Sequence, residues 1–432
     1  MYKIHKFGGS NFINKEVFES FYKILSSFKG KSLIIISALG KTTRRLYESV
    51  NLASINKLDE SLKILEKLEY FTQNIIEAIF ENDAFKKECV EFVSNLFIEL
   101  DNLYRNIAIF QELTPRTLDL VLSYGEQISA TIFQQFLHSK NFQFKFISAQ
   151  ELITTDNNFT KANPLEELIN VNIHKFLIPI FAENNVVLTQ GFIGKTKDGE
   201  TTTMGFESSN LTALIFASSL NSPEITIWTD VEGIYNIDPH FFSSARQIPI
   251  LKFSDAIQSA DFGSKIFYPH MLIEAEKQGM TIFYKSIINP VQHFTEISPR
   301  ASEKQKLITI SDKVFNVYSQ NTAYAKIENL LIYEKQNSNF IVKHNNSFNF
   351  FTDNFKVIEQ FEGANEQIDV YSVINLINYN VLDIYKIILN YSDLFINFDY
   401  KLYQMNDSVL SIFLKKIENQ ALLKIIEILT NI

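Results

Sequence analysis

Residues 191–239 read GFIGKTKDGETTTMGFESSNLTALIFASSLNSPEITIWTDVEGIYNIDP, and the order of turns, helix and strand in this stretch decides the fold. Gly191 and Gly194 lead into a hairpin with the polar tip KDGE, followed by three threonines. A turn of small residues then opens an apolar helix over 211–220. The next strand, 225–228, ends in Thr229 and Asp230. Ligands of open α/β sheets bind at such strand ends, and a glycine- and serine-rich turn that opens a helix suits an anion.

The chain before this stretch predicts a parallel sheet with helical connections. Tyr2–Phe7 alternates between polar and apolar residues and then meets a glycine turn, which is typical of a strand. A helix over 17–25 and a buried strand over 33–36 follow, and this strand–helix–strand order favours parallel pairing. Residues 46–109 are helical in pattern, and Thr114 and Pro115 are suited to begin another helix as N-cap and first residue. Further strands are expected over 144–147 and 186–189.

The chain changes character beyond residue 300. Before that point we expect helices over 253–262 and from 269, a closing strand over 281–286, and a polar connector bracketed by prolines. Only one of the 13 glycines, Gly363, lies in the tail. Strand patterns at 306–310, 339–342 and 348–352, with helix patterns at 373–377, 382–391 and 421–430, predict small α+β modules.

Length and composition set the broad class. With 432 residues the chain has room for two or three domains, and 46% hydrophobic and 21% charged residues are typical of a globular protein. The net charge of -9 argues against nucleic acid or an acidic membrane as a partner. One cysteine, Cys89, excludes an intrachain disulfide. The N-terminus has no signal-peptide pattern and no apolar run reaches membrane-spanning length, so the expected location is the cytoplasm.

Four motifs together resemble those of aspartate kinases, which are members of the amino-acid kinase family. They are KFGG at 6–9, DGETTTMG at 198–205, IWTDVEGIYNIDP at 227–239 and FGSKIFYP at 262–269. The resemblance implies an α/β fold, an αβα sandwich around a mostly parallel open sheet, over residues 1–292. In position and length, residues 303–432 resemble the family's regulatory ACT domains, which implies two intertwined α+β (ferredoxin-like) modules. Dimerisation through this tail is the expected partnership.

The resemblance assigns residues to the nucleotide. Lys6 would steady the transferring phosphate, and Lys265 would contact the nucleotide phosphates. On spacing alone, a solvent-exposed lysine at a strand end is the favoured interpretation of Lys6, and only the combination with the 191–239 stretch reverses this. Trp228 is expected in the core. No cluster of histidine, cysteine and carboxylate residues has metal-ligand spacing, so Mg²⁺ is expected to arrive with ATP. The full set of expected nucleotide-binding residues is Lys6, Gly8, Gly9, Ser10, Thr229, Asp230, Tyr235, Asp238, Gly263, Ser264 and Lys265.

The resemblance also assigns residues to the amino-acid substrate. Glu126, in SYGEQIS, would bind the ammonium group, although a helical glutamate is by itself usually a solvated surface residue. Thr43, in SALGKTT, would help to hold the substrate, and a helix N-cap is the plain alternative. Ser209 and Asn210 complete the expected set.

One loop departs from the family pattern. Where the family has Arg-Gly-Gly-Ser-Asp, residues 206–210 read Phe-Glu-Ser-Ser-Asn. The family arginine grips a substrate carboxylate, which a phenylalanine does not do. Losing such a bond costs about 1.5–3 kcal/mol. We hypothesise that Arg44, the residue after Thr43, supplies the replacement guanidinium.

The first functional hypothesis is therefore an aspartate kinase that transfers the γ-phosphate of MgATP to the β-carboxylate of L-aspartate. This reaction gives 4-phospho-L-aspartate and opens lysine, threonine and methionine biosynthesis. The altered 206–210 loop motivates a second hypothesis, an amino-acid kinase homologue with a changed acceptor. A third is a non-catalytic, nucleotide-binding regulatory protein, against which the retention of Lys6, Glu126 and Lys265 argues. A screen of acceptors separates the three.

Overall fold

The computed structural model divides into two compact units. The first comprises Met1–Gly233 and Glu274–Glu296, and the second comprises Ile234–Ile273 and Ile297–Ile432. The structure describes residues 1–206, 208–239, 242–264, 266–320, 340–344, 347–352, 367–395, 399–415 and 419–430. The domain limits expected from the sequence, 1–292 and 303–432, stay predictions.

The first unit has alternating strands and helices. In chain order its elements are β1 (Tyr2–Phe7), η1 (Gly9–Asn11), α1 (Lys15–Ser27), β2 (Lys31–Ile36), α2 (Thr42–Ser54), α3 (Leu58–Ile79), α4 (Asp83–Phe110), α5 (Pro115–Ser139), β3 (Lys145–Phe146), α6 (Ala149–Leu152), α7 (Glu166–Asn172), η2 (Ile173–Leu177), α8 (Ile178–Glu183), β4 (Val186–Gln190), β5 (Ile193–Lys195), β6 (Thr201–Thr203), α9 (Ser209–Ser219), β7 (Glu224–Thr229), β11 (Thr281–Ser286) and β12 (Phe294–Ile297). Helix α11 (Pro269–Lys277) spans the point at which the chain passes back into this unit.

The main sheet of the first unit is largely parallel, as predicted. Its strands run in the order β12-β11-β7-β1-β2-β4-β3. Strand β1 lies centrally and pairs in parallel with β2 on one side and β7 on the other. Strands β2, β3 and β4 then extend the sheet in one direction, and β11 extends it in the other. The connections therefore leave β1 in opposite directions, which is the arrangement that opens a ligand crevice at the carboxyl ends of the strands.

Helices cover both faces of this sheet. Ile34 and Ile36 of β2 belong to a hydrophobic core shared with α1 and α5. Because side chains alternate along a strand, Leu33 and Ile35 face the opposite layer, where α9 packs against β1, β2 and β7. Trp228 is 5% exposed and stacks on the ring of Phe7, so it is a core residue, as expected. The predicted αβα layering is confirmed.

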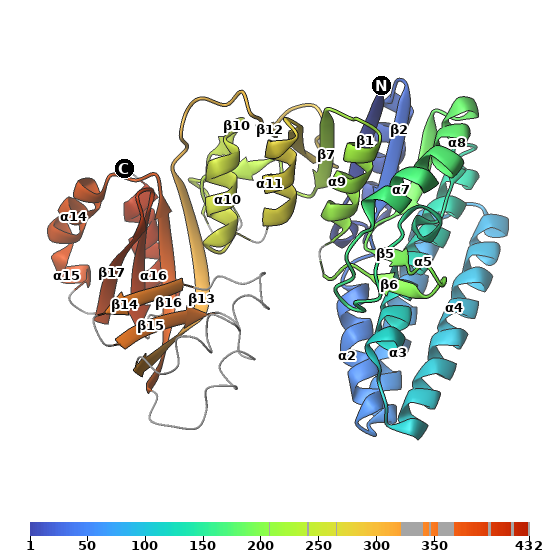
Figure 1. Cartoon of the computed structure of the whole chain (residues 1–432), viewed down its shortest axis with the longest axis horizontal. Coiled ribbons are helices and arrows are strands. Elements are labelled where there is room, and N and C mark those ends of the chain that lie inside the picture. Colours follow the sequence, from blue (N-terminus) through green and yellow to red (C-terminus); the bar gives the residue numbers. More distant parts are fainter. Residues whose placement is uncertain are drawn as a thin grey trace. The chain divides into compact units, whose positions relative to one another are not determined.

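Four helices, α2 to α5, form a long excursion between β2 and β3 (Figure 1). Each packs against the next, and α2 also packs against α5, so their apolar faces are buried together. The Thr114 side chain accepts a hydrogen bond from the Thr117 amide, and Pro115 is the first helical residue, as predicted. Among the helices that the structure describes, none combines the length and apolar character needed to cross a bilayer.

The second unit is an α+β structure. Its elements are β8 (Ile234–Tyr235), β9 (Gln247–Ile248), β10 (Ile250–Leu251), α10 (Phe253–Asp261), β13 (Leu307–Gln320), β14 (Phe340–His344), β15 (Ser347–Thr352), β16 (Gln367–Ile377), α14 (Val381–Asn390), α15 (Ser392–Phe395), β17 (Asp399–Asn406), β18 (Val409–Lys415) and α16 (Asn419–Thr430). A six-stranded antiparallel sheet runs in the order β14-β15-β13-β16-β18-β17. Apolar side chains from α14 and α16 share one core with the strands of this sheet.

One element of the tail was predicted wrongly. Residues 373–377 have a helix-like pattern but form the end of β16, which pairs with β13 and β18. Val373, Ile374 and Ile377 are fully buried, because a central strand of this sheet is covered on both faces. A short apolar run of this kind does not separate a buried strand from a buried helix. The helices predicted at 382–391 and 421–430 are confirmed as α14 and α16.

Buried polar contacts join the tail sheet to the segment around α10 within the second unit. The side-chain amide of Asn375, on β16, donates to the Phe262 carbonyl at 2.8 Å and accepts from the Ser411 hydroxyl at 2.6 Å. The Asp255 carboxylate, on α10, accepts from the Gln305 amide at 2.8 Å. Buried polar groups without partners are costly, so these bonds fix the tail sheet and α10 in one packed unit.

Candidate active site

Two glycine turns interlock at the carboxyl ends of β1 and β2. A Cβ at Gly9 would collide with the Ala38 carbonyl and lie 2.6 Å from its carbon, so only glycine fits there. The Gly40 amide donates to the Gly9 carbonyl at 2.8 Å. The Lys6 Nζ lies 3.7 Å from the point where a Gly8 Cβ would stand. The turn after β1 therefore carries a positive charge against bare glycine backbone, as phosphate binding requires.

A buried glutamate lies against the second of these turns. Glu126, on α5, is 2% exposed, and its Oε1 accepts from the Ala38 amide at 3.2 Å. Its Oε2 is buried and has no hydrogen-bond partner in the described chain. Gly125 allows this approach, because a Cβ there would lie 3.1 Å from the Ala38 Cβ. Burial raises the pKa of Glu126 to about 8. A ligand ammonium group would satisfy the orphaned oxygen and favour the charged carboxylate.

The start of α2 brings Thr43 to the same place. The Thr43 hydroxyl lies 3.5 Å from the Cβ position of Gly125, so this half-buried side chain adjoins the glutamate. Arg44 is different, because its side chain is 78% exposed and pairs with Glu48 at 3.3 Å on the surface of α2. A substrate role for Arg44 would require this exposed ion pair to give way, which costs little.

The loop before α9 holds several buried polar atoms. Ser209 is buried against Gly191, where a Cβ would lie 2.7 Å from the Ser209 hydroxyl. The Ser208 hydroxyl and the Asn210 Oδ1 are buried without partners in the described chain. Unpaired buried polar atoms at the start of a helix mark a place where a polar ligand would be accommodated.

Phe206 links this loop to α2 through an aromatic contact. Its ring is 44% exposed and packs edge-on against Tyr47, with centroids 5.7 Å apart. A guanidinium at this position would be able to bind a carboxylate, whereas the Phe206 ring offers only apolar surface. Glu207 lies outside the described residues.

The Thr-Asp turn after β7 lies beside the lysine turn. The Gly8 amide donates to the Trp228 carbonyl at 3.2 Å. With its amide oriented to satisfy both groups, Asn11 accepts from the Asp230 amide at 3.0 Å and donates to the Asp230 carboxylate at 3.3 Å. The Thr229 hydroxyl accepts from the Val231 amide at 3.0 Å. Asn11 thus ties the first and third motifs together, a role that its place after the glycine turn did not signal.

The remaining predicted nucleotide residues belong to the second unit. Tyr235 lies in β8, Asp238 follows it, and Gly263 and Ser264 follow α10. Gly263 has φ +104 and no room for a Cβ beside the Ser311 hydroxyl, so glycine is required there. Lys265 lies outside the described residues. Ser10, in the first unit, is exposed after the lysine turn.

The three threonines of the DGETTT motif anchor the β5–β6 hairpin. The hydroxyl of Thr201 accepts from Gln150 at 2.9 Å, and that of Thr202 lies 2.7 Å from the Thr155 hydroxyl. Thr203 donates to Asp119 on α5 at 2.6 Å. The sequence reasoning missed Asp119, whose available signal was its place seven residues before Glu126 on one helix.

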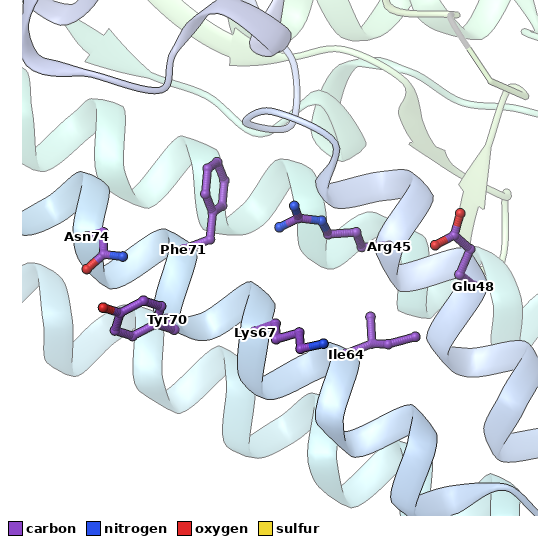
Figure 2. A pocket seen from close by; sticks show the side chains of 7 residues that line it. All are labelled: Arg45, Glu48, Ile64, Lys67, Tyr70, Phe71 and Asn74. Carbon is purple, nitrogen blue, oxygen red and sulfur yellow. The ribbon is translucent and has the colours of Figure 1, made fainter.

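A separate surface pocket of about 420 Å³ lies between α2 and α3 (Figure 2). It is lined by Arg45, Glu48, Ile64, Lys67, Tyr70, Phe71 and Asn74, none of which was predicted as a site residue. The Arg45 guanidinium lies over the Phe71 ring, 5.3 Å from its centroid. We place the site at the glycine turns instead, because Glu126, whose buried Oε2 has no partner in the described chain, lies against them.

Comparison with known proteins assigns the first part of the chain to a family. The model of the amino acid kinase family matches residues 1–285. The chain belongs to the amino acid kinase family. As a family member, it has the amino acid kinase fold in its first part, and the antiparallel tail sheet is consistent with the ACT-like modules expected there.

Several aspartokinases are similar in sequence. The chain is 30% identical to lysine-sensitive aspartokinase 3 of Escherichia coli over 296 residues, which are 66% of this chain and 62% of that protein. It is 29% identical to chloroplastic aspartokinase 3 of Arabidopsis thaliana over 315 residues, which are 71% of this chain and 55% of that protein. The matched region thus spans less than two thirds of the length of these relatives.

Solved structures extend the likeness in fold to the tail. Escherichia coli aspartokinase III, in complex with aspartate and ADP, matches with a TM-score of 0.79 at 21% identity, covering 98% of each chain. Clostridium acetobutylicum aspartate kinase matches with a TM-score of 0.67 at 17% identity, covering 99% of this chain and all of that one. At these identities the match establishes the fold.

Proposed function

We propose that this chain is an ATP-dependent aspartate kinase. In this reaction a β-carboxylate oxygen of L-aspartate attacks the γ-phosphorus of MgATP, the bond to the β,γ-bridging oxygen breaks, and ADP leaves. The product, 4-phospho-L-aspartate, starts the route to lysine, threonine and methionine. The sequence relatives named aspartokinase support the proposal, as does the aspartate and ADP complex of the E. coli enzyme, which has the same fold.

The observation that carries the proposal is the unpaired Oε2 of Glu126. A buried carboxylate with one satisfied and one orphaned oxygen is a good receptor for an ammonium group. Thr43 adjoins this carboxylate. Ser209 and Asn210 begin α9, where their polar atoms would orient the substrate. Arg44 remains our candidate for the guanidinium that Phe206 does not supply.

Charge neutralisation is the main catalytic requirement, because a carboxylate must approach a triphosphate. Lys6, beside the Gly8 turn, is the proposed partner of the transferring phosphate. By the family resemblance, Thr229, Asp230, Tyr235, Asp238, Gly263, Ser264 and Lys265 are proposed to bind the nucleotide.

The donor groups at this edge fit a Mg²⁺ ion that is carried by ATP. Such an ion keeps phosphate oxygens and waters and uses few protein ligands. Asp230 offers an exposed carboxylate, and no three His, Cys, Asp or Glu side chains gather into a metal site within the described residues. When bound with ATP, the ion would offset negative charge on the β- and γ-phosphates.

A second candidate follows from Phe206 and Tyr47. Their aromatic contact puts apolar surface where the family has an arginine, so an acceptor that lacks the corresponding carboxylate is the alternative substrate.

We also propose that the chain forms a homodimer through its tail and acts in the cytoplasm. Size-exclusion chromatography with light scattering on the full chain tests the dimer.

The test of function is ATP turnover by the purified chain with Mg²⁺ and L-aspartate, with hydroxylamine present to trap the acyl phosphate. Aspartate hydroxamate formed in proportion to ADP supports the aspartate kinase. Turnover with another carboxylic acid but not with aspartate identifies the homologue with a changed acceptor. ATP binding without turnover on any acceptor identifies a regulatory protein and overturns the kinase assignment.

A further inference from the structure

A buried carboxylate outside the predicted site anchors two loops. Asp119, on α5, is fully buried, and its Oδ2 accepts from the Thr160 amide at 2.8 Å and the Thr203 amide at 2.9 Å. Its Oδ1 accepts from the Thr203 hydroxyl at 2.6 Å. Three hydrogen bonds to one buried carboxylate make a strong local constraint, because each donor would lose its partner if the carboxylate moved.

The partners of Asp119 come from two separate segments. Thr203 is the last residue of β6, and Thr160 lies in the loop before α7 with φ +72. The Ala162 amide also donates to the Thr203 carbonyl at 3.0 Å. Asp119 therefore binds both the β5–β6 hairpin and the 154–165 loop to α5 through hydrogen bonds.

Hydrogen bonds hold Met204 and Ser208, two described residues between Thr203 and the start of α9. Only residues 204–208 separate Thr203 from Ser209. The Met204 amide is held by the Phe192 carbonyl at 3.0 Å, and the Ser208 amide by the Gly205 carbonyl at 3.3 Å. The Phe192 amide in turn donates to the Thr212 hydroxyl on α9 at 3.1 Å, so hydrogen bonds link the end of β6 to the helix that Ser209 and Asn210 begin.

Helix α5 carries both Asp119 and Glu126. The two residues are seven positions apart, which is nearly two helical turns and about 10 Å along the axis, on one face of the helix. Glu126 reaches the turn after β2, and Asp119 reaches the strand that leads into α9. A single rigid helix thus joins the two sides of the proposed substrate site.

We propose that Asp119 is a positioning residue for the amino-acid substrate, holding β6, and through it Ser209 and Asn210, at a fixed distance from Glu126. This inference rests on the proposed kinase function. It assigns Asp119 no contact with the substrate, so its loss acts through geometry.

Thr203→Val tests the inference with a nearly isosteric change that removes only the hydroxyl bond to Asp119. We expect the KM for aspartate to rise about tenfold, as for a lost bond to a charged group. The KM for ATP should change less than about twofold, because the nucleotide motifs are untouched. Thr203→Ser, which keeps the hydroxyl, should restore the wild-type KM.

Asp156→Asn is the matched control. Asp156 lies in the same loop and accepts from the Asn158 and Asn163 amides and from the Asn163 side chain, but it has no bond to α5. Its substitution should leave the KM for aspartate unchanged. Equal effects of Thr203→Val and Asp156→Asn, or an unchanged KM in Thr203→Val, would overturn the inference.

A second variant and a second measurement test the inference if Thr203→Val folds poorly. Asp119→Asn keeps the shape of the side chain, and hydrogen exchange of the Thr160 and Thr203 amides reports whether the anchor is released. Released amides with an unchanged KM for aspartate contradict the inference, and released amides with a raised KM support it. If the wild-type protein shows no turnover on any acceptor, both the proposed function and this inference are overturned. If the wild type is active and Thr203→Val has an unchanged KM for aspartate, only the inference is overturned.

Discussion

The backbone amide of Ala38 donates to Oε1 of Glu126 at 3.2 Å, while Oε2 of the same carboxylate is buried and unpaired within the described residues. The turn after β2 thus holds the glutamate in place, and its Oε2 can accept a hydrogen bond from a ligand. Because burial raises its pKa to about 8, its charge depends on pH near neutrality and on what binds beside it.

Aspartate affinity should rise with pH. Below about pH 8 the empty site holds a protonated Glu126, and binding an ammonium group requires that proton to leave. We expect the KM for aspartate to fall about tenfold per pH unit from pH 6 towards pH 8 and then level off. Steady-state kinetics across this range check it, with Glu126→Gln as the variant that should lose the pH dependence along with most of its affinity.

Stability of the substrate-free protein should change with the opposite sign. The pKa of Glu126 is raised from 4.5 to about 8 on folding, so the folded state retains a proton that the unfolded state releases between these values. Its contribution to the free energy of unfolding is full below pH 4.5 and is lost as the pH rises to about 8. Glu126→Gln should therefore gain in Tm relative to wild type from pH 5 to pH 8. A constant difference in Tm would contradict the assignment.

Gly9 and Gly8 should tolerate a methyl group very differently. Gly9→Ala places a Cβ into the Ala38 carbonyl, so the two turns must separate, at a cost of about 1–3 kcal/mol. Gly8→Ala meets its nearest neighbour at 3.5 Å and has φ -71, so it should fold normally. Thermal unfolding of the two variants compares them, and a Gly9→Ala protein as stable as Gly8→Ala would show that the turns are not interlocked.

Lys6→Met should reduce kcat about a hundredfold, because a charge aimed at the transferring phosphate is removed. Lys3→Met is the control on the same strand, since Lys3 is half-exposed and pairs with Glu224 at 3.6 Å. Turnover measured at saturating ATP and aspartate separates the two. Similar losses in both variants would mean that Lys6 acts through the general charge of β1.

Arg44→Ala should raise the KM for aspartate about tenfold and leave that for ATP unchanged, if Arg44 replaces the missing arginine of the 206–210 loop. Its ion pair with Glu48 is exposed, so the fold should lose little stability. Arg45→Ala is the neighbouring control, because that guanidinium lies over Phe71. An unchanged KM for aspartate in Arg44→Ala would end the hypothesis.

Most of the fold was predictable from local patterns. The glycine turn after β1, the Thr114–Pro115 start of α5 and the Thr-Asp end of β7 each combine a residue preference with a change of periodicity. The helix predicted at residues 373–377 was wrong. A short apolar run has no clear periodicity, and only its pairing with β13 and β18 shows that it is a strand.

The positions of candidate-site residues were predictable only where a motif surrounds the residue, and their roles stay predictions. Glu126 follows a glycine whose missing side chain lets α5 approach Ala38, and the SYGE motif signalled it. No motif marked the roles of Asp119 and Asn11, because their hydrogen-bond partners lie far away in the chain at Thr203 and Asp230. Polar residues whose role is to join two loops are recognised only once both loops are in place.

The hydrogen bonds between the tail sheet and the α10 segment bear on how this chain could be shortened. Cutting after residue 300 would strip the Gln305 amide from the buried Asp255 and the Asn375 side chain from the Phe262 carbonyl. The segment that contains the predicted nucleotide glycine, Gly263, would lose the scaffold on which it folds. Recombination that exchanges tails between related proteins would therefore have to carry residues 234–273 along with them.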